Sequence, residues 1–594
     1  MRSLLSILGV LELVSSATIE LNWDIGYVNA NPDGLFTRRV IGVNGKWPID
    51  PIIGSIGDRV IVHAHNSLDV KTSLHGHGLP FKNTQIYDGA VSVNHCGIPP
   101  GYNYTYTLDL PESGTYWFHS HSMGQYPDGL RTPLLVKDET EPVFYKYSDD
   151  FLLTLSDWYH TPASVLMETM IGPLNPGGSE PTPESGILND GRGGEFRVTP
   201  GETYRIRLIN TSTMAVWHVS VDEHDMTLIE VDGVHIQPKK LNSIELSPAQ
   251  RASFLITAKD TADMNYYIHA QMDPDYFDVV PDTLQLDYTA SLLYNDGTTF
   301  APASKHSWDT VSDLDLVPLH ELPYQEPEET HVLVSDIMQM DDGSARGLIN
   351  GVTFVPPKVP TILSMLTTGD LATNPEIYGP QSNPVVLGLN KTVRVVIANK
   401  HLDAHPFHVH GHKFQVLALD EGEYDPSKPV SAHLTQNPSR RDTVNVPGFG
   451  HAVIQFYTDN PGAWPVHCHN NWHMMFGMMA VFIEAPLQLQ KTLAFPFDTH
   501  NDICGAAGFM MSGNAAGNEG LDLTGAPYGP RMIDYGFHAK GIIALVFCII
   551  SAILGTASII YYSRALIKAF DAQQAEQRSL LVTGDSDELS EDES

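Results

Sequence analysis

Two short sequence phrases recur three times along the chain, always in the same order. The first is a turn followed by an alternating strand that ends in Asn, and its copies are GDRVIVHAHN from Gly57, GETYRIRLIN from Gly201 and LNKTVRVVIAN from Leu389. The second follows each of these at a distance, as GTYWFHSH from Gly114, MNYYIHA from Met264 and PGAWPVHCH from Pro461. Short strands rich in Val, Ile, Thr and Tyr between turns are typical of β-sandwiches. The repeat therefore predicts three copies of one sandwich rather than an α/β fold.

The repeat also predicts how the chain is divided, because 594 residues are too many for a single core. We expect a signal peptide over residues 1–17, sandwich domains over 18–140, 141–310 and 311–490, an extracellular extension over 491–540, a transmembrane helix over 541–563 and a cytoplasmic tail over 564–594.

The two ends of the chain indicate a membrane protein of the secretory pathway. Residues 1–17 combine Arg2, an apolar run and a small-residue cleavage site, as in a secretory signal. Residues 541–563 contain no charged residue and suffice to cross about 30 Å of hydrocarbon as a helix; a buried core helix is the alternative. The positive-inside rule places the tail in the cytosol because more basic residues follow this stretch than precede it: Arg564, Lys568 and Arg578 against Lys540. The glycosylation sequons would then face outward, at Asn103, Asn210 and Asn390.

The charge of the chain excludes one class of partner. The sequence has 70 acidic and 34 basic residues, a formal net charge of -36. Such a surface repels nucleic acid and favours cations.

Histidine pairs separated by one residue gather in the first and third repeats. The pairs and their neighbours are HGH at His75 and His77, HSH at His119 and His121, HPFHVHGH with His405, His408, His410 and His412, and HCH at His467 and His469. The corresponding phrase of the second repeat holds only His269. Side chains two apart on a strand point to the same face. The pairs therefore predict one metal cluster where the first and third domains meet.

The stretch WPVHCHNNWHMMFGM, residues 464–478, predicts a second kind of metal site. A thiolate, two imidazoles and a distant thioether form the ligand set of a blue-copper centre, here Cys468, His405, His473 and Met478. Zinc is the competitor, but a structural zinc site rarely lies among eight further histidines. On a strand Cys468 points to one face and its two neighbours to the other, so that one copper would be joined to the cluster by covalent bonds. Because three other methionines lie close by, packing is the alternative role for Met478.

Four segments resemble the copper signatures of the multicopper oxidases, the group of laccases, ascorbate oxidases and ferroxidases. They are LHGHGL, GTYWFHSH, HPFHVHGH and HCHNNWHMMFGM. The resemblance implies an all-β fold of three cupredoxin-like β-sandwich domains plus one C-terminal transmembrane helix. It implies four copper ions: one type 1, one type 2 bound by His75 and His408, and two type 3 bound by His77, His119, His121, His410, His467 and His469. O2 would be reduced there to water by four electrons.

Two residues depart from the pattern of this family. Gly76 stands between the first two histidines, where an aromatic residue is usual, and it loosens that strand. Met478 stands at the axial position, where fungal members often have Leu or Phe. A thioether there lowers the copper potential relative to a side chain that does not ligate.

Further segments resemble the fungal iron-transport ferroxidases, which are anchored by a C-terminal helix. They include LNPGGSEPTP, HDMTLIEVDG, DYFDVVPDTLQL, NPEIYGP and LDLTGAP. By this resemblance Glu180, Asp278 and Tyr378 would handle iron near the type 1 copper, with Asp273 as a substitute for Asp278. His401 stands where the subgroup has a further acid, so that acid's role either has moved to Asp403 or is absent. Carboxylates stabilise Fe3+ over Fe2+, which lets the electron leave readily.

The remaining cysteines fit the same resemblance. Laccase-like members have a bridge between the first domain and the C-terminal extension, which implies a disulfide between Cys96 and Cys504 in an oxidising compartment.

The function expected is a copper ferroxidase that uses Fe2+ and O2 and passes Fe3+ to an iron permease in the same membrane. A phenol-oxidising laccase is the alternative enzyme, and an apolar pocket beside the type 1 copper would favour it. A copper-binding electron carrier would not need eight histidines for O2. We expect a plasma-membrane location, with a vacuolar or endosomal membrane as the alternative because EQRSLL, residues 576–581, resembles a dileucine sorting signal.

Overall fold

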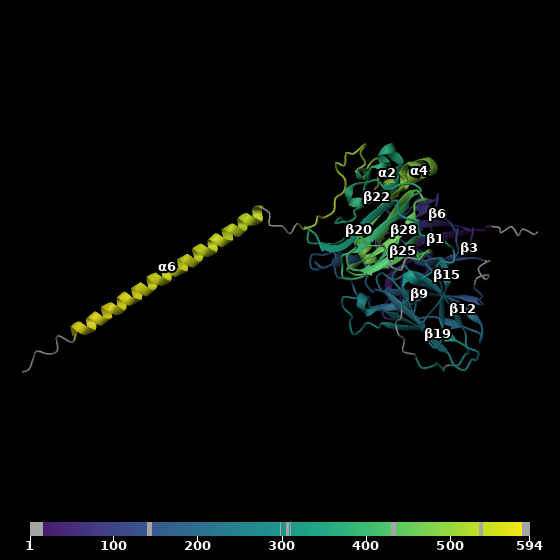
Figure 1. Cartoon of the computed structure of the whole chain (residues 1–594), viewed down its shortest axis with the longest axis horizontal. Helices are drawn as coiled ribbons and strands as arrows, with labels where there is room; N and C mark the ends of the chain where they lie inside the picture. Colours follow the sequence, from purple (N-terminus) through teal and green to yellow (C-terminus); the bar gives the residue numbers. More distant parts are fainter. Residues whose placement is uncertain are drawn as a thin grey trace, which may run out of the picture. The chain divides into compact units, whose positions relative to one another are not determined.

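The computed structural model describes residues 16–138, 145–297, 299–303, 308, 310–428, 430, 435–533 and 539–584. It divides into two compact units, Met1–Met532 and Ile533–Ser594. Most of the expected signal peptide lies outside the described residues. In the part of the larger unit that is described, the strands form six sheets, which fall into three pairs along the chain. The three expected β-sandwiches are thereby confirmed (Figure 1); the exact domain boundaries stay a prediction.

The first sandwich has two four-stranded sheets, with strand orders β2-β1-β4-β6 and β3-β8-β7-β5. Its strands are β1 (Thr18–Ala30), β2 (Arg38–Val43), β3 (Ile52–Ser55), β4 (Arg59–Asn66), β5 (His75–His77), β6 (Asn103–Asp109), β7 (Gly114–His119) and β8 (Arg131–Lys137). The segment between β5 and β6 includes the 3-10 helix η1 (Gln85–Tyr87).

The second sandwich has sheets of order β10-β9-β12-β17-β14-β15 and β11-β19-β18-β13-β16. In Figure 1 its labels β9, β12 and β19 lie together, in blue to teal. Its strands are β9 (Asp149–Trp158), β10 (Ser185–Leu188), β11 (Glu195–Arg197), β12 (Thr203–Asn210), β13 (Trp217–Val221), β14 (Met226–Val231), β15 (Val234–Leu241), β16 (Ile244–Leu246), β17 (Arg251–Thr257), β18 (Tyr266–Met272) and β19 (Asp287–Leu293).

The third sandwich has sheets of order β21-β20-β23-β28-β25-β26 and β22-β30-β29-β24-β27. Its strands are β20 (Glu329–Gln339), β21 (Ala345–Ile349), β22 (Pro384–Leu387), β23 (Thr392–Asn399), β24 (His405–Val409), β25 (Phe414–Glu421), β26 (Arg440–Arg441), β27 (Thr443–Val446), β28 (Gly450–Tyr457), β29 (Gly462–Cys468) and β30 (Met479–Glu484).

The two recurring sequence phrases form equivalent strands in the three sandwiches. The first phrase forms β4, β12 and β23, and each of these pairs in parallel with the first strand of its own sandwich: β1, β9 and β20. In β4 the side chains of Val60, Val62 and Ala64 are buried while Arg59 and His63 are exposed. This period of two places one face of the strand in the core.

Short helices connect and cover the sandwiches. They are α1 (Ala163–Met170), α2 (Thr361–Thr367), α3 (Asn471–Met475), α4 (Pro486–Thr492) and α5 (Phe497–Ala506), with the 3-10 helices η3 (Pro274–Tyr276), η4 (Asp313–Asp315), η5 (Gly369–Thr373), η6 (Pro375–Tyr378) and η7 (Pro380–Ser382). Helix α5 is bonded to the first sandwich through the disulfide Cys96–Cys504, which confirms the expected bridge.

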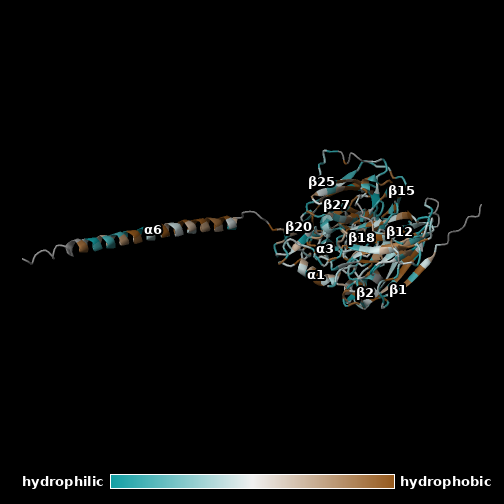
Figure 2. Cartoon of the chain, turned by 90° about the horizontal axis from the view of Figure 1, so that it is seen from below, coloured by the Kyte–Doolittle hydropathy of each residue, from teal (hydrophilic) through white to brown (hydrophobic). Residues whose placement is uncertain are grey.

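The smaller unit contains one long helix, α6 (Ala539–Gly584). By length and composition it could cross a membrane. Figure 2 colours its N-terminal part mostly brown and its C-terminal part mostly teal. The helix continues past residue 563, where the apolar stretch was expected to end, because the polar sequence that follows is rich in the helix formers Ala, Leu, Gln, Glu and Arg.

Candidate metal centres

A cysteine and two histidines from three elements of the third sandwich surround one point. His405 begins β24, Cys468 ends β29 and His473 lies in α3. The Cys468 Sγ atom lies 3.5 Å from Nδ1 of His405 and 3.5 Å from Nδ1 of His473. All three side chains are buried. We call these residues the trio; their donor atoms lie close enough together to hold one metal ion.

Helix α3 determines where His473 lies. The Asn470 side chain caps the helix by accepting from the main-chain N–H of Trp472, at 3.1 Å. The Trp472 ring is fully buried in the core of the second sandwich, where its Nε1 donates to the Tyr159 hydroxyl at 3.3 Å. This packing fixes the short helix, and with it the imidazole of His473, against the second sandwich.

Met478 lies directly after this helix and is also buried. Its main-chain carbonyl accepts from the Cys468 N–H at 3.2 Å, and its own N–H donates to the His473 carbonyl at 3.0 Å. The backbone therefore keeps residue 478 beside the trio whatever side chain it carries.

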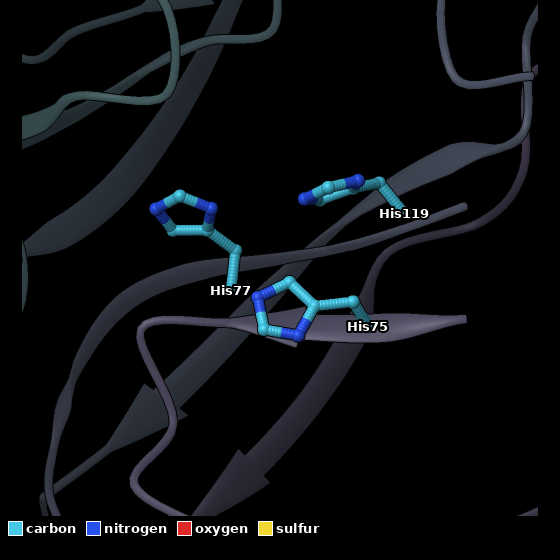
Figure 3. Close-up of side chains that lie close together, drawn as sticks. All are labelled: His75, His77 and His119. Carbon is cyan, nitrogen blue, oxygen red and sulfur yellow. The ribbon is translucent and has the colours of Figure 1, made fainter. Parts of the chain in front are cut away.

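Eight other histidines of the four motifs form a second group, the eight-histidine cluster: His75, His77, His119, His121, His408, His410, His467 and His469. All are buried, and overlapping sets of three have donor atoms close enough to share a metal ion: His75, His77 and His119; His75, His408 and His410; His121, His410 and His467. The ring of His469 lies 5.0 Å from that of His77 and 5.6 Å from that of His119. Figure 3 shows the imidazoles of His75 and His77 from β5 and His119 from β7 turned toward one another.

One ring nitrogen of several clustered histidines is held by a carbonyl oxygen. The Nδ1 atoms of His75, His119 and His408 donate to the main-chain oxygens of Asp88, Ser120 and Asp442 at 2.8, 2.9 and 2.8 Å. A carbonyl only accepts, so Nδ1 carries the proton. In the neutral ring the Nε2 atom is then an unprotonated donor of a lone pair.

The free nitrogens of these rings are suited to metal binding. In the described part of the chain, buried atoms without a hydrogen-bond partner include Nε2 of His75, His119 and His408 and Nδ1 of His77 and His469. Burial lowers the pKa of His119 and of His469 well below the usual range, so both imidazoles are neutral. Unpaired buried nitrogens are costly unless a ligand satisfies them. The residues therefore fit a group of bound metal ions.

An acidic pocket adjoins the trio. Its lining includes Glu180, Asp278 and Asp403, together with Tyr276 and His473. The Nε2 of His473 donates a short hydrogen bond to Oε1 of Glu180. Burial raises the pKa of Glu180 to about 7, and it also raises the pKa of Asp403. A cation in the pocket would relieve both effects.

His401 makes the corresponding contact with the other imidazole of the trio. Nε2 of His405 lies 3.4 Å from Nδ1 of His401, which in turn lies 3.4 Å from Oδ2 of Asp403. The two outer nitrogens of the trio thus face Glu180 on one side and the His401–Asp403 pair on the other.

Two residues expected at the iron site lie elsewhere. Tyr378 ends η6 within an apolar cluster, and its hydroxyl donates to the Ala372 carbonyl at 2.7 Å, so the structure does not bring it to the acidic pocket. Tyr276 is the tyrosine that lines the pocket. Asp273 does not replace Asp278, because it accepts from Nε2 of His218 at 3.1 Å and caps η3.

Two buried carboxylates beside the eight-histidine cluster were not identified from the sequence. Asp88 accepts from Nδ1 of His410 at 2.9 Å, and Asp442 lies 3.2 Å from Nε2 of His77. Neither belongs to a metal-ligand motif of the sequence, and only the folded chain shows what they touch.

A cavity of about 920 Å³ reaches the cluster. Its lining includes His75, His408 and His410, and also the exposed ion pair between Lys82 and Asp459. Small molecules such as O2 and water therefore have a route between solvent and the histidines.

Three segments match family models described as multicopper oxidase: residues 24–141, 149–297 and 354–488. The chain is 39% identical to an iron transport multicopper oxidase of Gibberella zeae, over 93% of this chain and 90% of that protein. It is 40% identical to the iron transport multicopper oxidase fio1 of Schizosaccharomyces pombe, over 92% of this chain and 89% of that protein.

Solved structures are similar as well. The crystal structure of Fet3p, a multicopper oxidase that functions in iron import, matches with a TM-score of 0.84 at 32% identity, over 87% of this chain and all of that one. A laccase from Botrytis aclada matches with a TM-score of 0.71 at 27% identity, over 83% of this chain and 92% of that one.

Proposed function

This chain belongs to the multicopper oxidase family and is an oxidoreductase that uses copper, and from that premise we propose that it oxidises Fe2+ to Fe3+ and reduces O2 to water in support of iron uptake. The relatives named above are iron transport multicopper oxidases, and Fet3p functions in iron import. The observation that carries the proposal is the acidic pocket, in which Glu180 is hydrogen-bonded to a histidine of the trio.

We assign four copper ions to the two groups of side chains. The trio and Met478 would hold the type 1 ion. His75 and His408 would hold the type 2 ion, and the type 3 pair would be held by His77, His119, His121, His410, His467 and His469. Bound there, copper would supply one-electron acceptance at the trio and four-electron reduction of O2 to water at the eight-histidine cluster.

The main chain supplies the link between the two groups. Cys468 is covalently joined to His467 and His469, both of which belong to the eight-histidine cluster. An electron that reaches the Cys468 sulfur therefore has a path of covalent bonds to the place where O2 is consumed.

The acids of the pocket select the reducing substrate. Glu180, Asp278 and Asp403 offer hard oxygen ligands, which stabilise Fe3+ over Fe2+ and so favour loss of an electron from bound iron. Glu180 contacts His473 directly, and Asp403 contacts His405 through His401. Bound iron would thus lie one or two side chains from the trio.

A phenol-oxidising laccase is the alternative function. The pocket also has apolar lining residues, among them Met214, Val216 and Pro248, which could contact an aromatic ring. Three carboxylates in one small pocket nevertheless favour a cation over a neutral phenol.

The test compares oxygen uptake driven by Fe2+ with uptake driven by a phenol. In the double variant Glu180→Ala with Asp278→Ala we expect kcat/KM for Fe2+ to fall about 10- to 100-fold while phenol oxidation persists. Asp273→Ala is the matched control, because it removes a nearby acid that lies outside the pocket lining. Undiminished Fe2+ oxidation in the double variant would show that the iron site is elsewhere.

We further propose that α6 anchors the protein as a single-pass membrane protein with the copper-binding unit outside the cell. The apolar part of α6 is followed by three basic residues and preceded by one, which supports a cytosolic C-terminus. The plasma membrane is the location that fits iron uptake, with a vacuolar or endosomal membrane as the alternative. An iron permease in the same membrane would receive the Fe3+.

A further inference from the structure

The second sandwich supplies none of the histidines assigned to copper, yet its Arg251 is linked to two of them through Asp442. Arg251 begins β17 and is fully buried. Resting on the copper assignment proposed above, we infer that Arg251 is a positioning residue: through Asp442 it holds the imidazoles of His77 and His408 in the orientation that the copper cluster requires.

The first step is a two-pronged ion pair between sandwiches. Nη1 of Arg251 donates to Oδ1 of Asp442 at 2.7 Å, and Nη2 donates to Oδ2 at 2.6 Å. Asp442 comes from the third sandwich, between β26 and β27, and is also buried. Two parallel hydrogen bonds fix the plane of the carboxylate as well as its position.

The second step runs from Asp442 to two histidines. Its Oδ1 lies 3.2 Å from Nε2 of His77, and its main-chain oxygen accepts from Nδ1 of His408 at 2.8 Å. The hydroxyl of Thr443 donates to Oδ1 of Asp442 at 3.0 Å. The rings of His77 and His408 stack with centroids 3.8 Å apart. One residue thus holds one nitrogen of each ring.

This arrangement explains which nitrogen of each ring is left free for a metal ion. Asp442 engages the Nε2 side of His77 but the Nδ1 side of His408. Within the described residues the opposite atoms, Nδ1 of His77 and Nε2 of His408, have no hydrogen-bond partner. Both unpaired nitrogens are therefore directed to metal by contacts on the far side of the ring.

Arg251 is itself fixed by all three sandwiches. Its Nε donates to the main-chain oxygen of Thr115 in β7 of the first sandwich at 3.0 Å. Its main-chain N–H donates to Oδ1 of Asp232 in the second sandwich at 2.8 Å. With Asp442 as the third partner, the guanidinium joins the two sandwiches that carry histidines to the one that carries none.

Arg207 provides a matched control. It lies in β12, beside β17, is equally buried, and donates from Nη1 to the Thr115 hydroxyl at 3.1 Å and from Nη2 to Asp150 at 3.0 Å. It therefore joins the second sandwich to the first through the same threonine that Arg251 contacts, but its partners do not include Asp442 or a clustered histidine.

The experiment compares Arg251→Lys with Arg207→Lys in the full-length, copper-loaded protein. Lysine keeps the charge but cannot make two parallel bonds to one carboxylate. We measure copper per chain by mass spectrometry, the electron paramagnetic resonance spectrum of type 2 copper, the blue absorption of the trio and the thermal unfolding midpoint.

We expect Arg251→Lys to hold type 2 copper about 10- to 100-fold more weakly or with altered hyperfine splitting, while its blue absorption is kept. Arg207→Lys should keep both signals. If Arg251 served stability alone, both variants would have a lower unfolding midpoint, and the type 2 spectrum of each would match that of the parent protein. Unchanged type 2 copper in Arg251→Lys would overturn the inference.

Two further outcomes are separable from these. If Arg251→Lys does not fold, Asp442→Asn decides, because it keeps the shape of the side chain and removes the charge; an unaltered type 2 spectrum in that variant rejects the positioning role. If the parent protein itself binds no copper, the proposed function fails rather than the role of Arg251.

Discussion

Single hydrogen bonds behind the imidazoles decide what the eight-histidine cluster can bind. A carbonyl behind Nδ1 of His75, His119 and His408 places the proton there and leaves Nε2 as a lone-pair donor. In the trio the outer nitrogens face Glu180 and His401, so the inner nitrogens face the cysteine sulfur. Ligand geometry is therefore built into the protein before any metal binds.

The side chain of Met478 provides a test of the trio. Replacing it by leucine should raise the type 1 potential by at least about 59 mV, a tenfold change for a one-electron couple, because the thioether no longer stabilises the oxidised ion. Loss of stability should stay below about 1.5 kcal/mol, since the volumes match. A redox titration of the blue absorption measures the shift.

Met475→Leu is the control for this change. The Met475 sulfur accepts from the Asn471 side chain at 3.2 Å, and Met475 packs against the core of the second sandwich. It is therefore not placed to act as the axial ligand of the trio. We expect its potential to match that of the parent protein. If Met478→Leu also left the potential unchanged, Met478 would serve in packing alone.

His95 predicts a pH dependence of stability outside the copper sites. Burial lowers its pKa from 6.5 to about 3. Below pH 6.5 His95 is protonated in the unfolded chain but stays neutral in the folded chain. The free energy of unfolding therefore falls by about 1.4 kcal/mol for each pH unit between 6.5 and 3.

The variant His95→Asn tests this effect. Asparagine keeps an acceptor for the Gly97 N–H, which donates to Nδ1 of His95 at 2.8 Å, but it does not titrate. The variant should be less stable than the parent at pH 7, and the gap between their unfolding midpoints should narrow at pH 5. An equal difference between the two unfolding midpoints at pH 7 and at pH 5 would contradict the prediction.

At the scale of elements, the sequence predicted strands better than it predicted contacts. The period-two pattern of β4, β12 and β23 is visible in the letters, and so are the histidine pairs at the ends of strands. Arg251 and Asp442 carry no such signal, because they lie 191 residues apart and neither belongs to a motif of the sequence. Only the packing of one sandwich on another brings them together.

Tyr378 shows the limit of carrying a role over from a resemblance. The residue lies in η6, a short 3-10 helix whose turn directs the side chain into an apolar cluster. Its hydroxyl is satisfied by the Ala372 carbonyl, and burial raises its pKa above the usual range. Tyr276, in η3 beside the acidic pocket, had no distinguishing feature in the sequence.

The disulfide gives a prediction for α5 and the segment around it. Cys96→Ser with Cys504→Ser should cost about 2–5 kcal/mol, because the bridge closes a loop of sequence separation 408 and so restricts the unfolded chain. Lys71 donates to the Ala507 carbonyl at 3.1 Å, and this hydrogen bond should remain in the absence of the disulfide. We therefore expect α5 to be held more weakly against the first sandwich but not released from it. Thermal unfolding and limited proteolysis of residues 497–533 measure the effect, and equal protease resistance with and without the bridge would contradict it.

At the scale of the whole molecule, the three sandwiches contribute different residues to the candidate sites. The first and third supply the clustered histidines from β5, β7, β24 and β29 and from the residues directly after the last three of these strands. The second supplies acids of the pocket and the guanidinium of Arg251. The sequence indicated the first part of this division, since histidines mark it. Of the second part, the resemblance to the iron-transport ferroxidases indicated Glu180 and Asp278, but the sequence did not indicate Arg251, because that residue belongs to no motif.

The larger unit should bind copper and oxidise Fe2+ in the absence of α6. Residues 1–532 form one compact unit that contains the trio, the eight-histidine cluster, the acidic pocket and the Cys96–Cys504 bridge. A chain ending at Met532 should therefore be secreted in soluble form, with the copper content, blue absorption and Fe2+ oxidation of the full-length protein. A chain ending at Gly584 is the matched control: it keeps α6, and we expect it to remain with membranes through alkaline carbonate extraction. Membrane retention of the shorter chain would show that α6 is not the anchor, whereas a soluble but colourless product would show that the copper sites depend on residues beyond 532.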